Sequence, residues 1–163
     1  MKIKGSILFI ILLVLDQLTK YQALTGLRGK PPIVLVPGIL ELTYVENRGA
    51  AFGILQNKMV FFFLMTAIIL AGILWVLRRL PGERRFRPLK VTFVVLASGA
   101  VGNLIDRIFR TYVVDFIYFK PINFPVFNVA DIYVTVSAAV LVLLFLFYYK
   151  DHELETVLGR ERK

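Results

Sequence analysis

The acidic residues of this chain are unevenly placed, and their placement bears directly on the chemistry it can perform. Five of the 11 acids lie in two strongly charged stretches, a basic one near residues 78–90 and one of mixed charge at 150–163. The other six lie beside or within apolar stretches: Asp16, Glu41, Glu46, Asp106, Asp115 and Asp131. Ionisable groups at membrane depth are costly and commonly mark functional sites. Two close carboxyl groups share a proton, so one can take a proton from water while the other protonates a scissile carbonyl.

Two different pairs of acids fit this chemistry. Asn103 and Asp106 share an N-x-x-D spacing with Asn128 and Asp131, and this spacing puts each amide on the same helix face as its carboxylate. The matched helix-end positions favour Asp106 with Asp131. Asp115, however, has no basic residue within four positions and lies in an apolar stretch. Burial there is expected to raise its pKa, so Asp115 is an alternative partner.

Each acid also has a purely structural interpretation. Asp131 follows a helix start and can complement the helix dipole. Asp106 can form an ion pair with its neighbour Arg107. Asp16 lies one helical turn before Lys20, and an i,i+4 ion pair is its expected role.

Composition excludes several other chemistries. Cysteine is absent and His152 is the single histidine, which argues against thiolate metal sites, cysteine nucleophiles and Ser-His-Asp catalysis. Ser98 and Ser137 are expected to pack helices together rather than act as nucleophiles. We therefore expect neither a metal nor an organic cofactor. The net charge of +9 comes mainly from basic residues that flank apolar blocks, so we expect no nucleic-acid partner.

The apolar blocks predict an all-α membrane protein, organised as a single domain over residues 1–163. Hydrophobic residues make up 58% of the chain and charged residues 19%. The blocks are long enough to cross a bilayer as helices, and none alternates like a barrel strand. Four spans are predicted, at about 6–24, 59–77, 89–106 and 131–149. The first has a poor cleavage region after its apolar core and is expected to be a retained anchor rather than a cleaved signal peptide.

Lysine and arginine counts predict the orientation. One side carries 12 of these residues, including the dense loop at about 78–88, and the other side carries 8. The positive-inside rule places both termini and this loop in the cytoplasm. The outer segments are then about 25–58 and 107–130. In the first, Ile33–Val36 and Ile39–Val45 resemble short strands between proline and glycine turns, so a small β-rich outer segment is expected.

Five sequence blocks, in order, resemble those of the bacterial signal peptidase II family, the lipoprotein signal peptidases. Asp16-Gln17-Leu18-Thr19-Lys20 resembles the family's D-Q-x-x-K, and residues 47–53 resemble N-x-G-A-A-F. Residues 99–107 resemble G-A-x-G-N-x-x-D-R. Residues 113–116 and 127–131 resemble V-V-D-F and F-N-x-A-D.

The resemblance implies particular roles for individual residues. It assigns the catalytic pair to Asp115 and Asp131, and leaves Asp106 with Arg107 as a supporting pair. Further residues are implied to hold the site or the substrate: Asp16, Lys20, Asn47, Gly49, Gly99, Asn103, Asn128 and Ala130.

The implied activity is removal of the signal peptide from prolipoproteins, by cleavage before a cysteine that carries diacylglycerol. The implied setting is the bacterial inner membrane, with the active site near its outer face in contact with lipid. Cyclic peptides such as globomycin are the expected inhibitors, and a monomer is expected. Two other classes of function were weighed. A small proton- or cation-coupled transporter predicts acids near mid-membrane and usually internal repeats, whereas these acids gather toward one interface. A non-catalytic scaffold leaves the convergence of aspartates unexplained.

Overall fold

A computed structural model describes residues 2–49, 58–150 and 153. Ala50 to Gly53 of the predicted N-x-G-A-A-F block, and nearly all of the charged C-terminal segment, lie outside the described residues.

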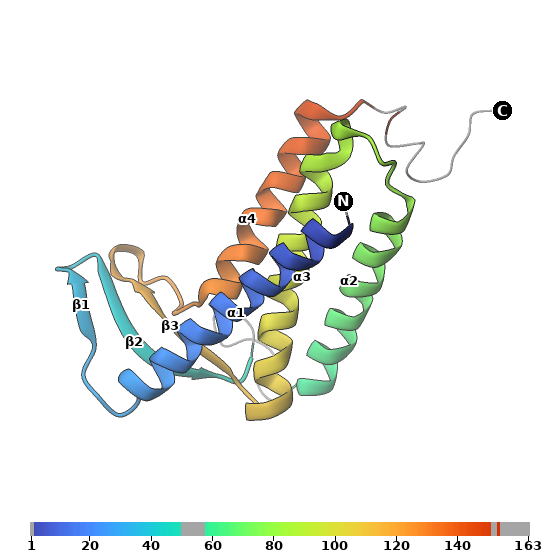
Figure 1. The fold of residues 1–163 in the computed structure, drawn as a ribbon. Helices are drawn as coiled ribbons and strands as arrows, with labels where there is room; N and C mark the ends of the chain where they lie inside the picture. The colour runs from blue at the N-terminus through green and yellow to red at the C-terminus, as the bar shows by residue number, and fades with distance from the viewer. Residues whose placement is uncertain (1, 50–57, 151–152, 154–163) are drawn as a thin grey trace.

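Within the described residues, four long helices form the body of the protein (Figure 1). They are α1 (Lys2–Gly26), α2 (Met59–Arg79), α3 (Arg87–Arg110) and α4 (Val129–Leu143), which continues into a π-helical turn at Leu144–Tyr148. Each is long and apolar enough to cross a membrane, with mean hydropathies between 1.5 and 2.7. The predicted class of membrane protein is therefore confirmed. The first three helices extend beyond their predicted apolar spans, because residues at their ends, many of them polar or charged, continue the helical backbone.

α3 is the central helix, because it packs against α1, α2 and α4. Close approach to α4 depends on Gly99, where a Cβ would lie 2.6 Å from the Ala130 carbonyl oxygen and 2.9 Å from Cγ2 of Val134. A Cβ on Gly102 would collide with the Asp16 carboxylate of α1. Small residues at such positions let helix backbones pack closely in membranes.

A three-stranded antiparallel sheet lies at one end of the helices (Figure 1). Its order is β1 (Ile33–Val36), β2 (Leu40–Asn47), β3 (Val113–Phe119). The first two strands agree with the sequence prediction, and β3 was not foreseen. Val114 and Phe116 of β3 are buried against Ala23 and Leu27 near the end of α1, which attaches the sheet to the helices.

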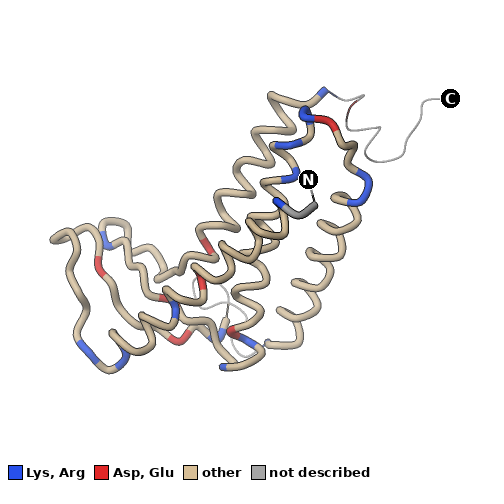
Figure 2. The backbone as a smooth tube through the Cα atoms, viewed as in Figure 1, with Lys and Arg blue, Asp and Glu red and all other residues tan. Residues whose placement is uncertain are grey.

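The opposite end of the bundle carries the α2–α3 loop, the start of α1 and the end of α4 (Figure 1). Figure 2 shows lysine and arginine residues at both ends of the molecule, with several of them along the α2–α3 loop at this end, whereas most acidic residues lie toward the sheet. Phe86 stacks on Tyr149 with ring centroids 5.6 Å apart, and Arg85 forms an ion pair with Glu153 at 2.8 Å. These contacts fix the loop to the end of α4, at the far end of the molecule from the sheet.

Candidate active site

Asp131 is placed by the first turn of α4. Asn128 is the N-cap: its side-chain oxygen accepts from the Asp131 backbone N–H at 3.0 Å, and Asp131 Oδ2 accepts from the Asn128 N–H at 3.1 Å. This reciprocal capping box satisfies two N–H groups that a helix start leaves unpaired. The other oxygen, Oδ1, accepts from Asn103 Nδ2 of α3 at 2.7 Å. The structural interpretation of Asp131 is thus correct, and its carboxylate is also held toward α3.

Asp115 lies in β3 and is almost completely buried, with 1% of its surface exposed. Asn47 Nδ2 donates to its Oδ2 at 2.8 Å, and Asn128 Nδ2 donates to its Oδ1 at 2.6 Å. Burial, followed by the charge of nearby Asp131, raises the pKa of Asp115 to about 7, against the lowering effect of the two amides. The predicted rise in pKa is confirmed, and it places the titration of this carboxyl near neutral pH.

A β-bulge brings Asn47 to the face of the sheet that carries Asp115. Leu42 pairs with Ile117, and Val45 pairs with Asp115, so three steps along β2 match two steps along β3. Side chains alternate across a regular strand, and one inserted residue reverses which face the following side chains occupy. Asn47, opposite Val113, therefore shares a face with Asp115, and it also accepts from the Gly49 N–H at 2.9 Å.

Asn103 and Asn128 connect the two aspartates. Asn128 donates to Asp115 and, at 3.2 Å, to Asn103 Oδ1. Asn103 in turn donates to Asp131. Asn128 and Asp131 are joined only through the capping box, in which each side chain accepts from the backbone N–H of the other residue. The amide of Asn103 donates to Asp131 of α4 and not to Asp106.

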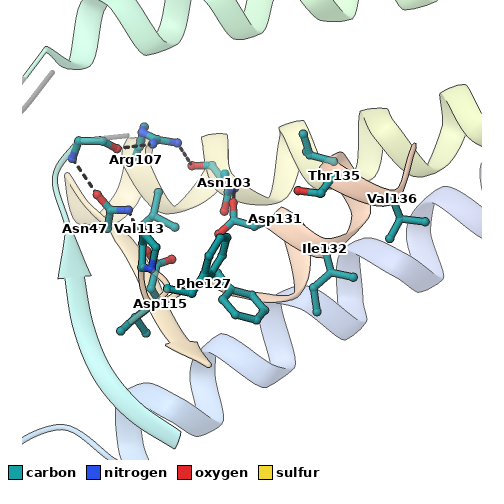
Figure 3. Close-up of a pocket in the computed structure, with 15 residues that line it drawn as sticks. Asn47, Asn103, Arg107, Val113, Asp115, Phe127, Asp131, Ile132, Thr135 and Val136 are labelled. Atoms are coloured by element: carbon teal, nitrogen blue, oxygen red, sulfur yellow. Dashed lines mark hydrogen bonds between the residues drawn. The ribbon is translucent and has the colours of Figure 1, made fainter. Parts of the chain in front are cut away.

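A cavity of about 440 Å³ opens beside these carboxylates (Figure 3). Its polar lining is Asn47, Gly49, Asn103, Arg107, Asp115 and Asp131. Its other wall is largely apolar, formed by the loop before α4 and by the first turns of α4: Phe124, Pro125, Val126, Phe127, Ile132, Val134, Thr135 and Val136. A chain segment with apolar side chains can therefore lie against one wall while a peptide group faces the carboxylates.

Arg107 closes one side of the cavity rather than pairing with its neighbour. Its guanidinium donates to the backbone oxygens of Gly49 at 3.1 Å and Asn103 at 3.4 Å, and lies 4.3 Å from the centre of the Phe62 ring. The predicted Asp106–Arg107 pair is wrong, because adjacent residues on a helix point to different faces. Arg107 instead joins α2, α3 and the end of β2.

Asp106 belongs to a buried charge cluster beneath the site. It forms ion pairs with Arg110, one turn along α3, and with Lys20 of α1 at 3.3 Å. The predicted pair between Asp16 and Lys20 is confirmed at 3.0 Å. The side chains of Asp16, Lys20 and Asp106 are fully buried. Asp115 and Asp131 line the cavity, and Asp106 is not among its lining residues.

Most of the predicted site residues lie together at the junction of α1, α3, α4 and the sheet. Gly99 and Ala130 contribute packing between α3 and α4, and the others form the two networks described above. Sequence reasoning missed Arg110, although its i,i+4 spacing from Asp106 was a usable signal. It also missed the apolar wall. Within the described residues, no three acidic or histidine side chains are grouped to hold a metal ion.

The fold and the site define a multi-pass membrane protein with a buried carboxylate, Asp115, and a partly buried one, Asp131, beside a cavity at one end of its helices. The family described as Signal peptidase (SPase) II matches residues 8–147. The chain therefore belongs to the signal peptidase II family, whose members are bacterial membrane peptidases.

Individual relatives agree with this assignment. The lipoprotein signal peptidase of Symbiobacterium thermophilum is 45% identical over 139 residues, covering 84% of this chain and 90% of the relative. That of Clostridium novyi is 42% identical over 137 residues, covering 82% and 91%. Two solved bacterial membrane enzymes share the fold. One has a TM-score of 0.77 at 29% identity, covering 98% of this chain and 93% of the other. The second has a TM-score of 0.75 at 31% identity, covering 90% and 94%.

Proposed function

We propose that this protein is an aspartic endopeptidase that removes the signal peptide from prolipoproteins carrying diacylglyceryl-cysteine, with Asp115 and Asp131 as its catalytic pair. The observation that carries the proposal is the convergence of these two carboxylates on one cavity in a chain of the signal peptidase II family. The family match gives no support to the transporter alternative.

The environments of the two acids support different roles for them. The pKa of Asp115 is raised to about 7 by its burial and by Asp131, so near neutral pH it can carry the shared proton. Asp131, with one N–H donor on each oxygen, then acts as the base. Two nearby carboxyl groups with separated protonation states can divide acid and base roles in this way.

The reaction follows from these roles. Asp131 takes a proton from a water molecule as the water oxygen attacks the scissile carbonyl carbon, while Asp115 protonates the carbonyl oxygen. A gem-diol intermediate results. The C–N bond then breaks as the amide nitrogen receives a proton from Asp131 and Asp115 takes back the hydroxyl proton. The products are a carboxyl-ended signal peptide and a lipoprotein with a free amino group at its lipidated cysteine.

The position of the cavity supports a membrane-anchored substrate. Part of its apolar wall belongs to α4, a helix apolar enough to span the membrane. The signal helix and acyl chains can stay in the bilayer while the peptide bond reaches the carboxylates. We place the site at the outer face and both termini in the cytoplasm, because the α2–α3 loop at the opposite end of the helices carries the densest cluster of basic residues. Asn47, Gly49 and Arg107 then border the bound peptide.

The test uses purified protein in detergent with one preprotein in two forms, with and without diacylglycerol on its cysteine. The lipidated form should lose a mass equal to its signal peptide, globomycin should block this loss, and a chelator should leave it unchanged. The unlipidated form is the matched control and should remain intact. Failure to cleave the lipidated form, or equal cleavage of both forms, would contradict the proposed substrate.

A further inference from the structure

Lys20 has three oxygen partners inside the protein. Its side chain is fully buried; Nζ donates a hydrogen bond to Asn103 Oδ1 at 2.8 Å and forms ion pairs with Asp16 Oδ2 at 3.0 Å and Asp106 Oδ2 at 3.3 Å. An ammonium group can donate but cannot accept, so all three partners present oxygen atoms to it. Two carboxylates are more than one ammonium needs for charge balance, and Arg110 supplies the second cation.

The first of these partners holds the backbone next to Asp131. Asp16 points one oxygen at Lys20, and its other oxygen, Oδ1, accepts from the Ala130 backbone N–H at 3.0 Å. Ala130 immediately precedes Asp131 in the first turn of α4. Charge-assisted bonds to backbone N–H groups are among the stronger hydrogen bonds in proteins. The position of Asp131 is therefore tied to α1 through Asp16.

The second partner holds the backbone next to Asp115 in the same way. Asp106 Oδ2 lies against Lys20 and also accepts from the Val114 backbone N–H at 3.1 Å. Val114 immediately precedes Asp115 in β3 and is fully buried. The carboxylate of Asp106 thus ties β3 to the same ammonium group that ties the start of α4.

The third partner sets the direction of an amide that contacts Asp131 directly. Because Lys20 can only donate, the oxygen of Asn103 must face it, and this oxygen also accepts from Asn128. The amide nitrogen of Asn103 is then directed at Asp131 Oδ1. With the opposite orientation of this amide, an oxygen would face a carboxylate oxygen and the bond would be lost.

We propose that Lys20 is a positioning residue that fixes the relative placement of Asp115 and Asp131 through Asp16, Asp106 and Asn103. Lys20 touches no reacting atom in this arrangement. Its contribution is to keep the two carboxylates at fixed positions relative to each other, which affects the chemical step more than substrate binding. The proposal rests on the proposed function of the Asp115–Asp131 pair.

Removing Lys20 alone would leave a buried negative charge without its cation, which is strongly destabilising. The test therefore starts from Asp16→Asn, whose side-chain oxygen can still accept from the backbone, and compares it with Asp16→Asn/Lys20→Met. Asp16→Asn leaves one cation in excess in the cluster, whereas the double variant is balanced, because Asp106 keeps Arg110 as its partner. Both variants are also made with Asn103→Ala, which completes a double-mutant cycle between Lys20 and Asn103.

Loss of Lys20 from the Asp16→Asn background should lower kcat roughly tenfold, as expected for a lost charge-assisted hydrogen bond, and leave KM within about twofold. The fold-change in kcat on losing Lys20 should be smaller when Asn103 is already alanine, because Lys20 acts on Asp131 through the Asn103 amide. Arg85→Met is the matched control: it breaks the remote ion pair with Glu153, so it should lower the melting temperature and leave kcat within about twofold.

An unchanged kcat, a change confined to KM, or a Lys20 factor that is the same with and without Asn103 would overturn the proposal. If the double variant does not fold, Asn103→Ala alone decides: it should lower kcat with little change in KM or melting temperature, and a normal kcat would refute the connection. The wild-type cleavage assay and the inactivity of Asp115→Asn are measured separately. If wild type cleaves and Asp115→Asn does not, but the double-mutant cycle shows no coupling between Lys20 and Asn103, then Lys20 is not a positioning residue and the proposed function still stands.

Discussion

Replacing Asp115 with asparagine should make the pH dependence of stability markedly weaker. Burial and the charge of Asp131 raise the pKa of this carboxyl from 3.8 to about 7 in the folded protein. When the pKa of an acid is higher in the folded state than in the unfolded state, the unfolded state releases its proton at lower pH. The free energy of unfolding therefore falls as the pH rises from the unfolded-state pKa to the folded-state pKa. The wild-type protein should therefore lose stability between about pH 4 and pH 7, and the variant lacks this loss.

The size of the effect follows from the same shift. A rise in the pKa from 3.8 to about 7 corresponds to about 4 kcal/mol at high pH, of which about 3 kcal/mol develops between pH 5 and pH 9. The substitution also has a cost that does not depend on pH. Both oxygens of Asp115 accept from amide groups, so an asparagine would turn a donor toward a donor, at about 1–3 kcal/mol.

The variant should thus be less stable than the wild type at pH 5, and the difference should vanish or reverse by pH 9. Thermal melting of both proteins in one detergent, across this pH range, measures it. Glu46→Gln is a useful control because Glu46 forms ion pairs with the exposed side chains of Arg28 and Arg48. This variant should not show a stability difference from wild type that vanishes or reverses between pH 5 and pH 9. A constant difference between Asp115→Asn and wild type at every pH would refute the reasoning, since Asp115 would then be ionised throughout.

Three other outcomes follow from the structure. Asn47→Ala removes a donor that lowers the pKa of Asp115, so the pKa should rise further and the alkaline limb of the kcat/KM profile should move to higher pH; an unmoved or acid-shifted limb would contradict this. Gly99→Ala should destabilise the protein by about 1–3 kcal/mol and reduce cleavage, because the added Cβ pushes α4 away from α3. Gly72→Ala is the control: its Cβ meets nothing within 4 Å, so it should be neutral or slightly stabilising in the same melting and cleavage assays. Reporter fusions test the orientation: those after Lys30 and Ile117 should report the outer side and one after Glu83 the cytoplasm, and a cytoplasmic signal from either of the first two would reverse it.

The helices could be predicted from the sequence because their signal is local. Long uncharged runs such as Met59 to Leu77 have few alternatives in a membrane, and the prolines and alternation around residues 31–45 were sufficient for two strands. β3 was missed because its burial pattern is not alternating. Four consecutive residues from Val113 to Phe116 are buried, since one face packs on α1 and the other faces the site.

Side-chain partners were less predictable than the elements that carry them. The regular alternation of β2 would put Asn47 on the opposite face from Leu42, and the bulge that reverses this leaves no clear sequence signal. Similarly, Asp106 was assigned to the adjacent Arg107, whereas helix geometry directs it to Arg110 and to Lys20 of another helix. Contacts between helices depend on how closely the helices pack, here at Gly99 and Gly102. The spacing of residues along one helix does not reveal the distance between two helices.

The central claim is that Asp115 and Asp131 carry out the chemistry together. It is tested most directly by measuring single-turnover cleavage of a lipidated preprotein by Asp115→Asn, Asp131→Asn, their double variant and Asp106→Asn. Each dyad variant should lose at least roughly 10³-fold in rate while still binding globomycin, and the double variant should be scarcely worse because the two acids act as one unit. Asp106→Asn should melt at a lower temperature but keep a measurable rate, because Asp106 holds β3 and does not line the cavity. Near-normal turnover by Asp115→Asn, with none by Asp106→Asn, would contradict the account and assign the chemistry to Asp106 with Asp131.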